Sequence, residues 1–152
     1  MTTKAPALLI GIGNRLRGDD GAGYRLAQIL ARRPPPGLQV LARQQLTPEL
    51  AEPLAAASRV LFVDAVLGGS GHGAELALMP VEPAVAAPPC SHRLTPAQLL
   101  GLSQGLYGRC PPAWQLLIPG QRWPISDQLS AATAAACRRA LPQLRRWSQG
   151  DA

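Results

Sequence analysis

Short apolar runs alternate with longer segments whose apolar residues recur at helical spacing. This alternation predicts an α/β fold in which a mostly parallel five-stranded sheet is sandwiched between helices. The runs expected to form strands are residues 7–13, 38–43, 59–66, 74–81 and 114–120. The segments expected to form helices are residues 22–33, 47–57, 95–106 and 126–147.

The boundaries of several segments carry their own signals. Residues 68–73, "GGSGHG", form a loop of hairpin length, so the run at 74–81 is expected as an antiparallel edge strand. Thr-Pro pairs precede the helices expected at 47–57 and 95–106, and they suit an N-cap followed by the first helical residue. No stretch is long enough to link two domains, so residues 1–152 are expected to form a single domain.

The composition narrows the class of protein. The chain has 152 residues, of which 47% are hydrophobic, so it can bury one core. No apolar run reaches the roughly 20 residues of a membrane helix, and the N-terminal run is too short for a signal peptide. We therefore expect a cytoplasmic protein. Its three cysteines, Cys90, Cys110 and Cys137, lack metal-ribbon spacing and are expected to be reduced thiols.

The net charge of +6 is carried by arginines scattered along the chain. One dense group stands near the C-terminus, at Arg138, Arg139, Arg145 and Arg146. Only 4% of residues are aromatic, which leaves no stacking platform for single-stranded nucleic acid. We expect solvated helix faces, with neither nucleic acid nor membrane as a partner. An acidic protein partner stays open.

A glycine-rich segment, "GIGNRLRGDDGAG" at residues 11–23, follows the first expected strand. It does not make a dinucleotide fingerprint, because Leu16 stands where the third glycine belongs and Arg43 stands near the expected acidic position. Adjacent Asp19 and Asp20 would repel a pyrophosphate and suit a cation instead. We expect one of them to cap the following helix and the other to face the strand ends.

Two more candidate ligands follow other strands. Asp64 ends the apolar run "VLFV", and His92 lies between the fourth strand and the next helix. Two carboxylates and an imidazole at the carboxyl ends of parallel strands would make an open site for Zn, Ni, Co or Mn. Alternatively, Asp64 is an exposed loop residue. His72 is expected in a solvated hairpin, and Cys90 is either structural or a soft metal contact.

The motifs "GIGNRLRGDDGAG", "LFVDAV" and "SHRLTPAQLL" resemble those of the hydrogenase maturation proteases. These nickel-dependent endopeptidases trim the C-terminus of the [NiFe]-hydrogenase large-subunit precursor. The resemblance covers nearly the whole chain and implies a twisted sheet between helices. It also implies Asp20, Asp64 and His92 as metal ligands and catalytic residues, nickel supplied by the precursor, and that precursor as the partner.

Hydrolysis in such a site would proceed without a covalent enzyme intermediate. In this hypothesis the glycines around Asp20 let a substrate backbone approach closely, and Asp19 is a candidate general base. Two other functions remain open on the sequence. One is a non-catalytic nickel-binding chaperone or checkpoint for the same precursor, and the other is a nucleotide-binding module on the same scaffold.

Overall fold

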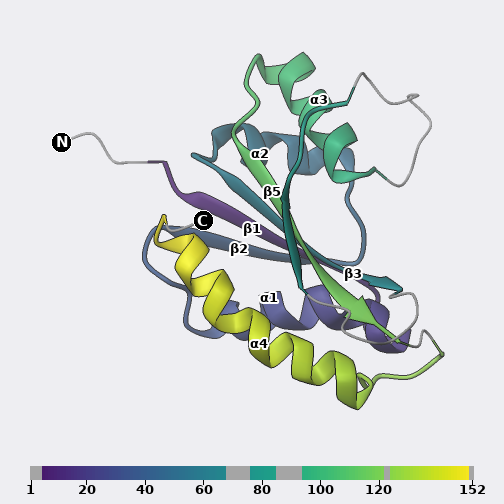
Figure 1. Ribbon diagram of the computed structural model, residues 1–152. Coiled ribbons are helices and arrows are strands. Elements are labelled where there is room, and N and C mark those ends of the chain that lie inside the picture. The colour runs from purple at the N-terminus through teal and green to yellow at the C-terminus, as the bar shows by residue number, and fades with distance from the viewer. Residues whose placement is uncertain (1–4, 68–75, 85–93, 122–123, 151–152) are drawn as a thin grey trace.

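A computed structural model of the chain describes residues 5–67, 76–84, 94–121 and 124–150. Its centre is one five-stranded sheet with the strand order β2-β1-β3-β5-β4 (Figure 1). The strands are β1 (Ala7–Ile12), β2 (Leu38–Arg43), β3 (Val60–Leu67), β4 (Ala77–Pro80) and β5 (Ala113–Gly120). All neighbouring strands pair in parallel except β4, which is antiparallel to β5 at the edge. The expected fold class and the antiparallel edge strand are confirmed.

Helices cover both faces of the sheet (Figure 1). They are α1 (Ala22–Arg32), α2 (Ala51–Ala56), α3 (Pro96–Tyr107) and α4 (Ala131–Ser148). Short 3₁₀ turns, η1 (Gly18–Gly21) and η2 (Pro48–Leu50), lead into α1 and α2. Helices α1 and α4 lie on one face, and α2 and α3 lie on the other.

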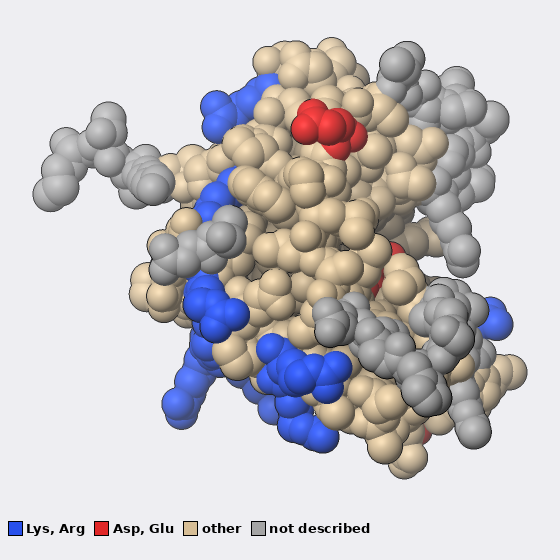
Figure 2. All heavy atoms as spheres, viewed as in Figure 1, with Lys and Arg blue, Asp and Glu red and all other residues tan. Residues whose placement is uncertain are grey.

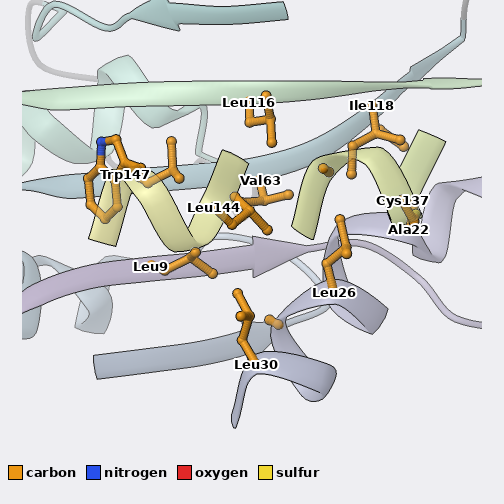
Figure 3. Packing of buried hydrophobic residues seen from close by; sticks show 14 of the residues in the cluster. Leu9, Ala22, Leu26, Leu30, Val63, Leu116, Ile118, Cys137, Leu144 and Trp147 are labelled. Carbon is orange, nitrogen blue, oxygen red and sulfur yellow. The ribbon is translucent and has the colours of Figure 1, made fainter. Parts of the chain in front are cut away.

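Each face of the sheet has its own apolar cluster, because successive side chains of a strand point to opposite faces. On the first face Leu9 and Val63 pack against α1 and α4, which contribute Leu26 and Leu144 (Figure 3). On the other face the alternate strand residues pack against α2 and α3. Strands buried on both faces explain why β1 and β3 are apolar almost throughout.

Two expectations about helix starts need correction, one about a boundary and one about a cap. The C-terminal helix was expected from residue 126, but α4 begins at Ala131, after an N-cap in which the Ser130 side chain accepts from the Thr133 N–H. Thr47 precedes η2 without a side-chain cap, whereas Thr95 makes a full capping box with Gln98 at the start of α3. Thr-Pro therefore precedes a helical segment at both positions, but only the Thr95 side chain caps its helix.

On the face drawn in Figure 2, many basic residues lie over the region of α4, and others lie at the upper left and at the right edge. Arg138, Arg139, Arg145 and Arg146 are exposed along α4, as expected for a solvated helix face. In the described part of the chain, no helix combines the length and the hydropathy that a membrane crossing requires. Cys110 and Cys137 are free thiols, while Cys90 lies outside the described residues.

Candidate carboxylate site

The strand order places a topological switch point between β1 and β3. The chain leaves β1 toward α1 on one face of the sheet, and it enters β3 from α2 on the other face. Side chains at the carboxyl ends of these two strands are therefore not covered by a crossover, which is where open α/β sheets bind ligands. Asp20 and Asp64 both come from this region.

Asp20 lies in the η1 turn directly before α1. Its Oδ2 accepts a hydrogen bond of 3.1 Å from the backbone N–H of Asn14, the second residue after β1. The helix start expected at residue 22 is confirmed, since α1 begins at Ala22. Asp20 itself lies just outside the α-helix, and the N-cap residue of α1 is Gly21, without a side-chain cap hydrogen bond. The expectation that one of the two aspartates caps this helix is therefore wrong.

Asp64 lies inside β3, within the strand expected over residues 59–66, and it is half-buried, so neither a position after the strand nor an exposed loop position is correct. The pairing of β3 with β1 ends at Val63, opposite Gly11, whereas its pairing with β5 continues to Leu67. Asp64 is thus held in the sheet on one side and flanked by the end of β1 on the other. A strand position of this kind orients a side chain more firmly than a loop would.

Both carboxylates line one cavity of about 290 Å³. The turn after β1 and the segment after β2 form two of its walls, and the start of α3 forms a third. The other lining residues are Ile12, Gly13, Asn14, Arg17, Gln44, Gln45, Leu46, Leu94, Thr95 and Pro96. Arg17 was not singled out from the sequence, although its place between Asn14 and the Asp pair in the turn was a usable signal.

The environment raises the pKa of Asp64 from 3.8 to about 7. Burial is the main cause, and the negative charge of Asp20 adds to it, while the 2.8 Å hydrogen bond from the Ala65 N–H opposes the rise. Because Asp20 and Asp64 line one cavity and the charge of Asp20 raises the pKa of Asp64, a second negative charge is disfavoured there unless a cation binds. The donor set therefore suits a divalent cation.

Asp19 has a different role from the one considered for it. It is fully buried and accepts hydrogen bonds from the N–H groups of Gln121 and Ser130, at 2.6 and 2.7 Å, and from the Ser130 hydroxyl at 2.8 Å. These bonds join η1 to the end of β5 and the start of α4. A side chain without exposed atoms is not available as a general base, so Asp19 is a structural residue.

The glycines of the turn also have a structural explanation. A Cβ atom added to Gly23 would lie 2.2 Å from the carbonyl oxygen of Val63, and one added to Gly13 would lie 1.9 Å from that of Asp20. The backbone that approaches them is the protein's own. The expectation that these glycines make room for a substrate is therefore wrong for these two positions.

The third expected ligand, His92, lies outside the described residues, as do His72 and Cys90. Leu94, two residues after His92 in the sequence, lines the cavity. Within residues 5–67, 76–84, 94–121 and 124–150, no three His, Cys, Asp or Glu side chains form a group that could hold a metal. The described part of the site is the pair Asp20 and Asp64.

Comparison with solved structures gives the same fold. The chain superimposes on the hydrogenase maturating endopeptidase HybD from E. coli with a TM-score of 0.77 at 19% identity, over 95% of this chain and 93% of that one. The [NiFe] hydrogenase maturation protease HycI from Thermococcus kodakarensis gives 0.68 at 20% identity, over 97% and 95%. A hydrogenase 2 maturation peptidase from a Thaumarchaeota archaeon gives 0.66 at 21% identity, over 97% and 99%.

No family model matches the sequence, and no curated protein matches it. The similarity therefore lies in the three-dimensional structure, where it extends over nearly the full length. The chain has the fold of the hydrogenase maturation proteases. The fold expected from the motif resemblance is confirmed.

Proposed function

We propose that the protein is an endopeptidase that removes the C-terminal extension of a nickel-loaded [NiFe]-hydrogenase large-subunit precursor. The proposal rests on one observation: Asp20 and Asp64 line the same cavity at the switch point of the sheet. The names of the structural neighbours, which are maturation endopeptidases, support the same activity. A cytoplasmic location stays a prediction.

In this proposal Asp20, Asp64 and His92 are the catalytic residues and the protein's ligands to nickel, which arrives as part of the substrate. Nickel held there would polarise the scissile carbonyl or lower the pKa of a water. Asp20 is held for this task by the Asn14 N–H, and Asp64 by the sheet. The Asp64 carboxyl, whose pKa is near 7, would release its proton as the cation binds.

A non-catalytic checkpoint that only senses loaded precursor would use the same carboxylates. What favours hydrolysis over that alternative is the open cavity beside them, which leaves space for a peptide segment and a water. A nucleotide-binding module is less well supported, because two carboxylates in the cavity would repel phosphate groups.

The test is a mass measurement on candidate precursors, chosen from hydrogenase genes near this one. We expect incubation with the protein to shorten a loaded precursor by its C-terminal extension. His92→Ala is expected to abolish the cleavage and leave the fold intact, whereas His72→Ala is expected to be nearly silent. An unchanged precursor mass would favour the checkpoint, and equal activity of the two histidine variants would remove His92 from the site.

A further inference from the structure

A second hollow of about 280 Å³ adjoins the carboxylate cavity. The two share Gly13, Asn14 and Gln44 as a common wall. A backbone hydrogen bond of 3.0 Å from the Gly13 N–H to the Arg43 carbonyl closes this wall. The second hollow is therefore a direct neighbour of the carboxylates, reached across the turn that follows β1.

Among the described residues, the second hollow is lined by arginines and no acidic residue, whereas the two carboxylates line the first. Arg15 and Arg43 line the second hollow, together with Tyr24 from the first turn of α1. The Arg15 guanidinium carbon lies 4.8 Å from the centre of the Tyr24 ring, and Nη1 of Arg43 donates to the Ala42 carbonyl at 2.9 Å. Both arginines are exposed, and each guanidinium group has one of these contacts with the protein.

Neither arginine forms a salt bridge with a carboxylate within the described part of the chain. The charge of Arg43 acts on Glu49, a fully exposed residue, and is the smallest of the causes that lower the pKa of its carboxyl group. Arg17, in the wall of the first cavity, adds a third positive charge. Guanidinium groups with spare donors are suited to a carboxylate from another molecule.

The sheet sets the distance between the backbone positions that carry Arg43 and Asp64. Arg43 pairs with Ile12 on β1, and Asp64 follows Val63, which pairs with Gly11, so Arg43 and Asp64 stand in one row across three strands. Neighbouring strands lie about 4.8 Å apart, which puts their Cα atoms roughly 10 Å from each other. An extended peptide covers that distance in about three residues.

We propose that Arg15 and Arg43, with Tyr24, form a subsite for a substrate carboxylate located about three residues from the scissile bond. The spacing from the scissile bond rests on the proposed function, whereas the binding of a carboxylate to Arg15 and Arg43 does not. Two carboxylates and one arginine line the first cavity, whereas two arginines and no acidic residue of the described part of the chain line the second, so an acidic group of the substrate is favoured in the arginine hollow, and this difference sets the register of the peptide. The carboxylate is either an acidic side chain or the free C-terminus of a short segment.

Peptide binding tests the subsite without any precursor. The probes are three hexapeptides: one fully blocked with an internal Glu, its Gln counterpart, and the Gln peptide with a free C-terminus. Binding is followed by NMR through the amides of Gly13 and Asn14. We expect the Glu or the free-carboxylate peptide to bind about tenfold more tightly than the blocked Gln peptide, and the tighter of the two identifies the source.

Variants locate the effect. Arg15→Gln combined with Arg43→Gln is expected to remove the preference, while Arg32→Gln, an exposed arginine at the end of α1, is expected to keep it. All three positions are exposed, so unchanged thermal unfolding serves as the folding control. Equal binding of all three peptides would overturn the proposal, as would an Arg32→Gln variant that loses the preference.

Precursor kinetics separate this inference from the proposed function. For a precursor that is cleaved, the double variant is expected to raise KM about tenfold with kcat nearly unchanged, because the subsite positions the substrate and does not touch the reacting bond. An unchanged KM would overturn the subsite. If no precursor is cleaved but the peptide preference persists, the proposed function fails and the subsite stands.

Discussion

At the residue scale, the two adjacent aspartates of the turn divide structure and chemistry between them. Asp19 is buried and takes three hydrogen bonds from Gln121 and Ser130. Asp20 is half-buried, takes one bond from the Asn14 N–H and lines the cavity with Asp64. The sequence predicted that one aspartate caps the helix and the other faces the strand ends, and only the second part is correct. The partners of Asp19 lie more than 100 residues away along the chain, where local patterns carry no signal.

This division predicts opposite effects for two matched substitutions. Asp19→Asn is expected to lower the free energy of unfolding by about 2–4 kcal/mol, because an amide cannot accept from all three donors. Asp20→Asn is expected to leave stability nearly unchanged and to abolish precursor cleavage. Urea unfolding and the cleavage assay measure the two effects, and a stable but inactive Asp19→Asn protein would contradict the assignment.

The raised pKa of Asp64 predicts a dependence of stability on pH. Between pH 3.8 and about 7 the native protein keeps a proton that the unfolded chain has released, so this group lowers the free energy of unfolding as pH rises. Asp64→Asn is expected to match the wild type near pH 4 and to exceed its stability by about 1–3 kcal/mol at pH 8. Urea unfolding at both pH values measures this, with Glu52→Gln as an exposed control. A variant less stable than the wild type at pH 8 would contradict the claim that the charged form of Asp64 destabilises the folded protein.

At the element scale, α1 lies unusually close to the sheet. Gly23 at its start faces the carbonyl oxygens of Val63 and Ile12, which a Cβ would approach to 2.2 and 2.6 Å. This contact brings η1, and with it Asp20, down onto β3 beside Asp64. The site geometry therefore depends on a helix position that has no side chain.

The close approach predicts a contrast between two glycines. Gly23→Ala is expected to lower the free energy of unfolding by more than about 3 kcal/mol, since backbone on both sides blocks the methyl group. Gly105→Ala, in α3 where nothing lies within 4 Å of the added atom, is expected to raise it by about 0.5–1 kcal/mol. Denaturant unfolding measures both, and a mild effect at Gly23 would show that α1 can shift.

Periodicity predicted the elements better than their ends. The bounds of β2 are those expected, because Gly37 and the polar residues after Arg43 interrupt a short apolar run. The start of α4 was missed by five residues, because residues 126–130 also look helical, and the cap at Ser130 becomes evident only with its bond to Asp19. Similarly, Asp64 reads as a strand end although pairing with β5 carries the strand past it.

At the scale of the whole molecule, the carboxylate cavity lies at the ends of two strands and not on either helix-covered face of the sheet. The α1–α4 side carries exposed arginines (Figure 2), while the carboxylates open at the ends of β1 and β3. Strand order decides this arrangement, and the sequence supported it through the alternation of strands and helices. Side-chain positions in the cavity depend on packing between β1, β3 and α1, which periodicity alone does not specify.

The source of the metal is a property of the enzyme and precursor together. Under the proposed function, two carboxylates and one imidazole without a thiolate would make a moderate nickel site, and a hydrolase that kept its metal permanently would cut other proteins as well. If nickel arrives with the precursor, the site is complete only on a correctly loaded substrate, which provides the specificity. We therefore predict that the purified protein is largely free of metal, as metal analysis of the isolated chain would measure.

The most direct measurement mixes chelator-treated, metal-free protein with nickel-loaded and nickel-free precursor and follows release of the C-terminal fragment by mass spectrometry. The account predicts release from the loaded precursor alone, and no release when Asp20→Asn or Asp64→Asn replaces the wild type. Release from both precursors at similar rates would contradict a metal carried by the substrate. Release from neither, with the fold intact, would contradict the endopeptidase itself.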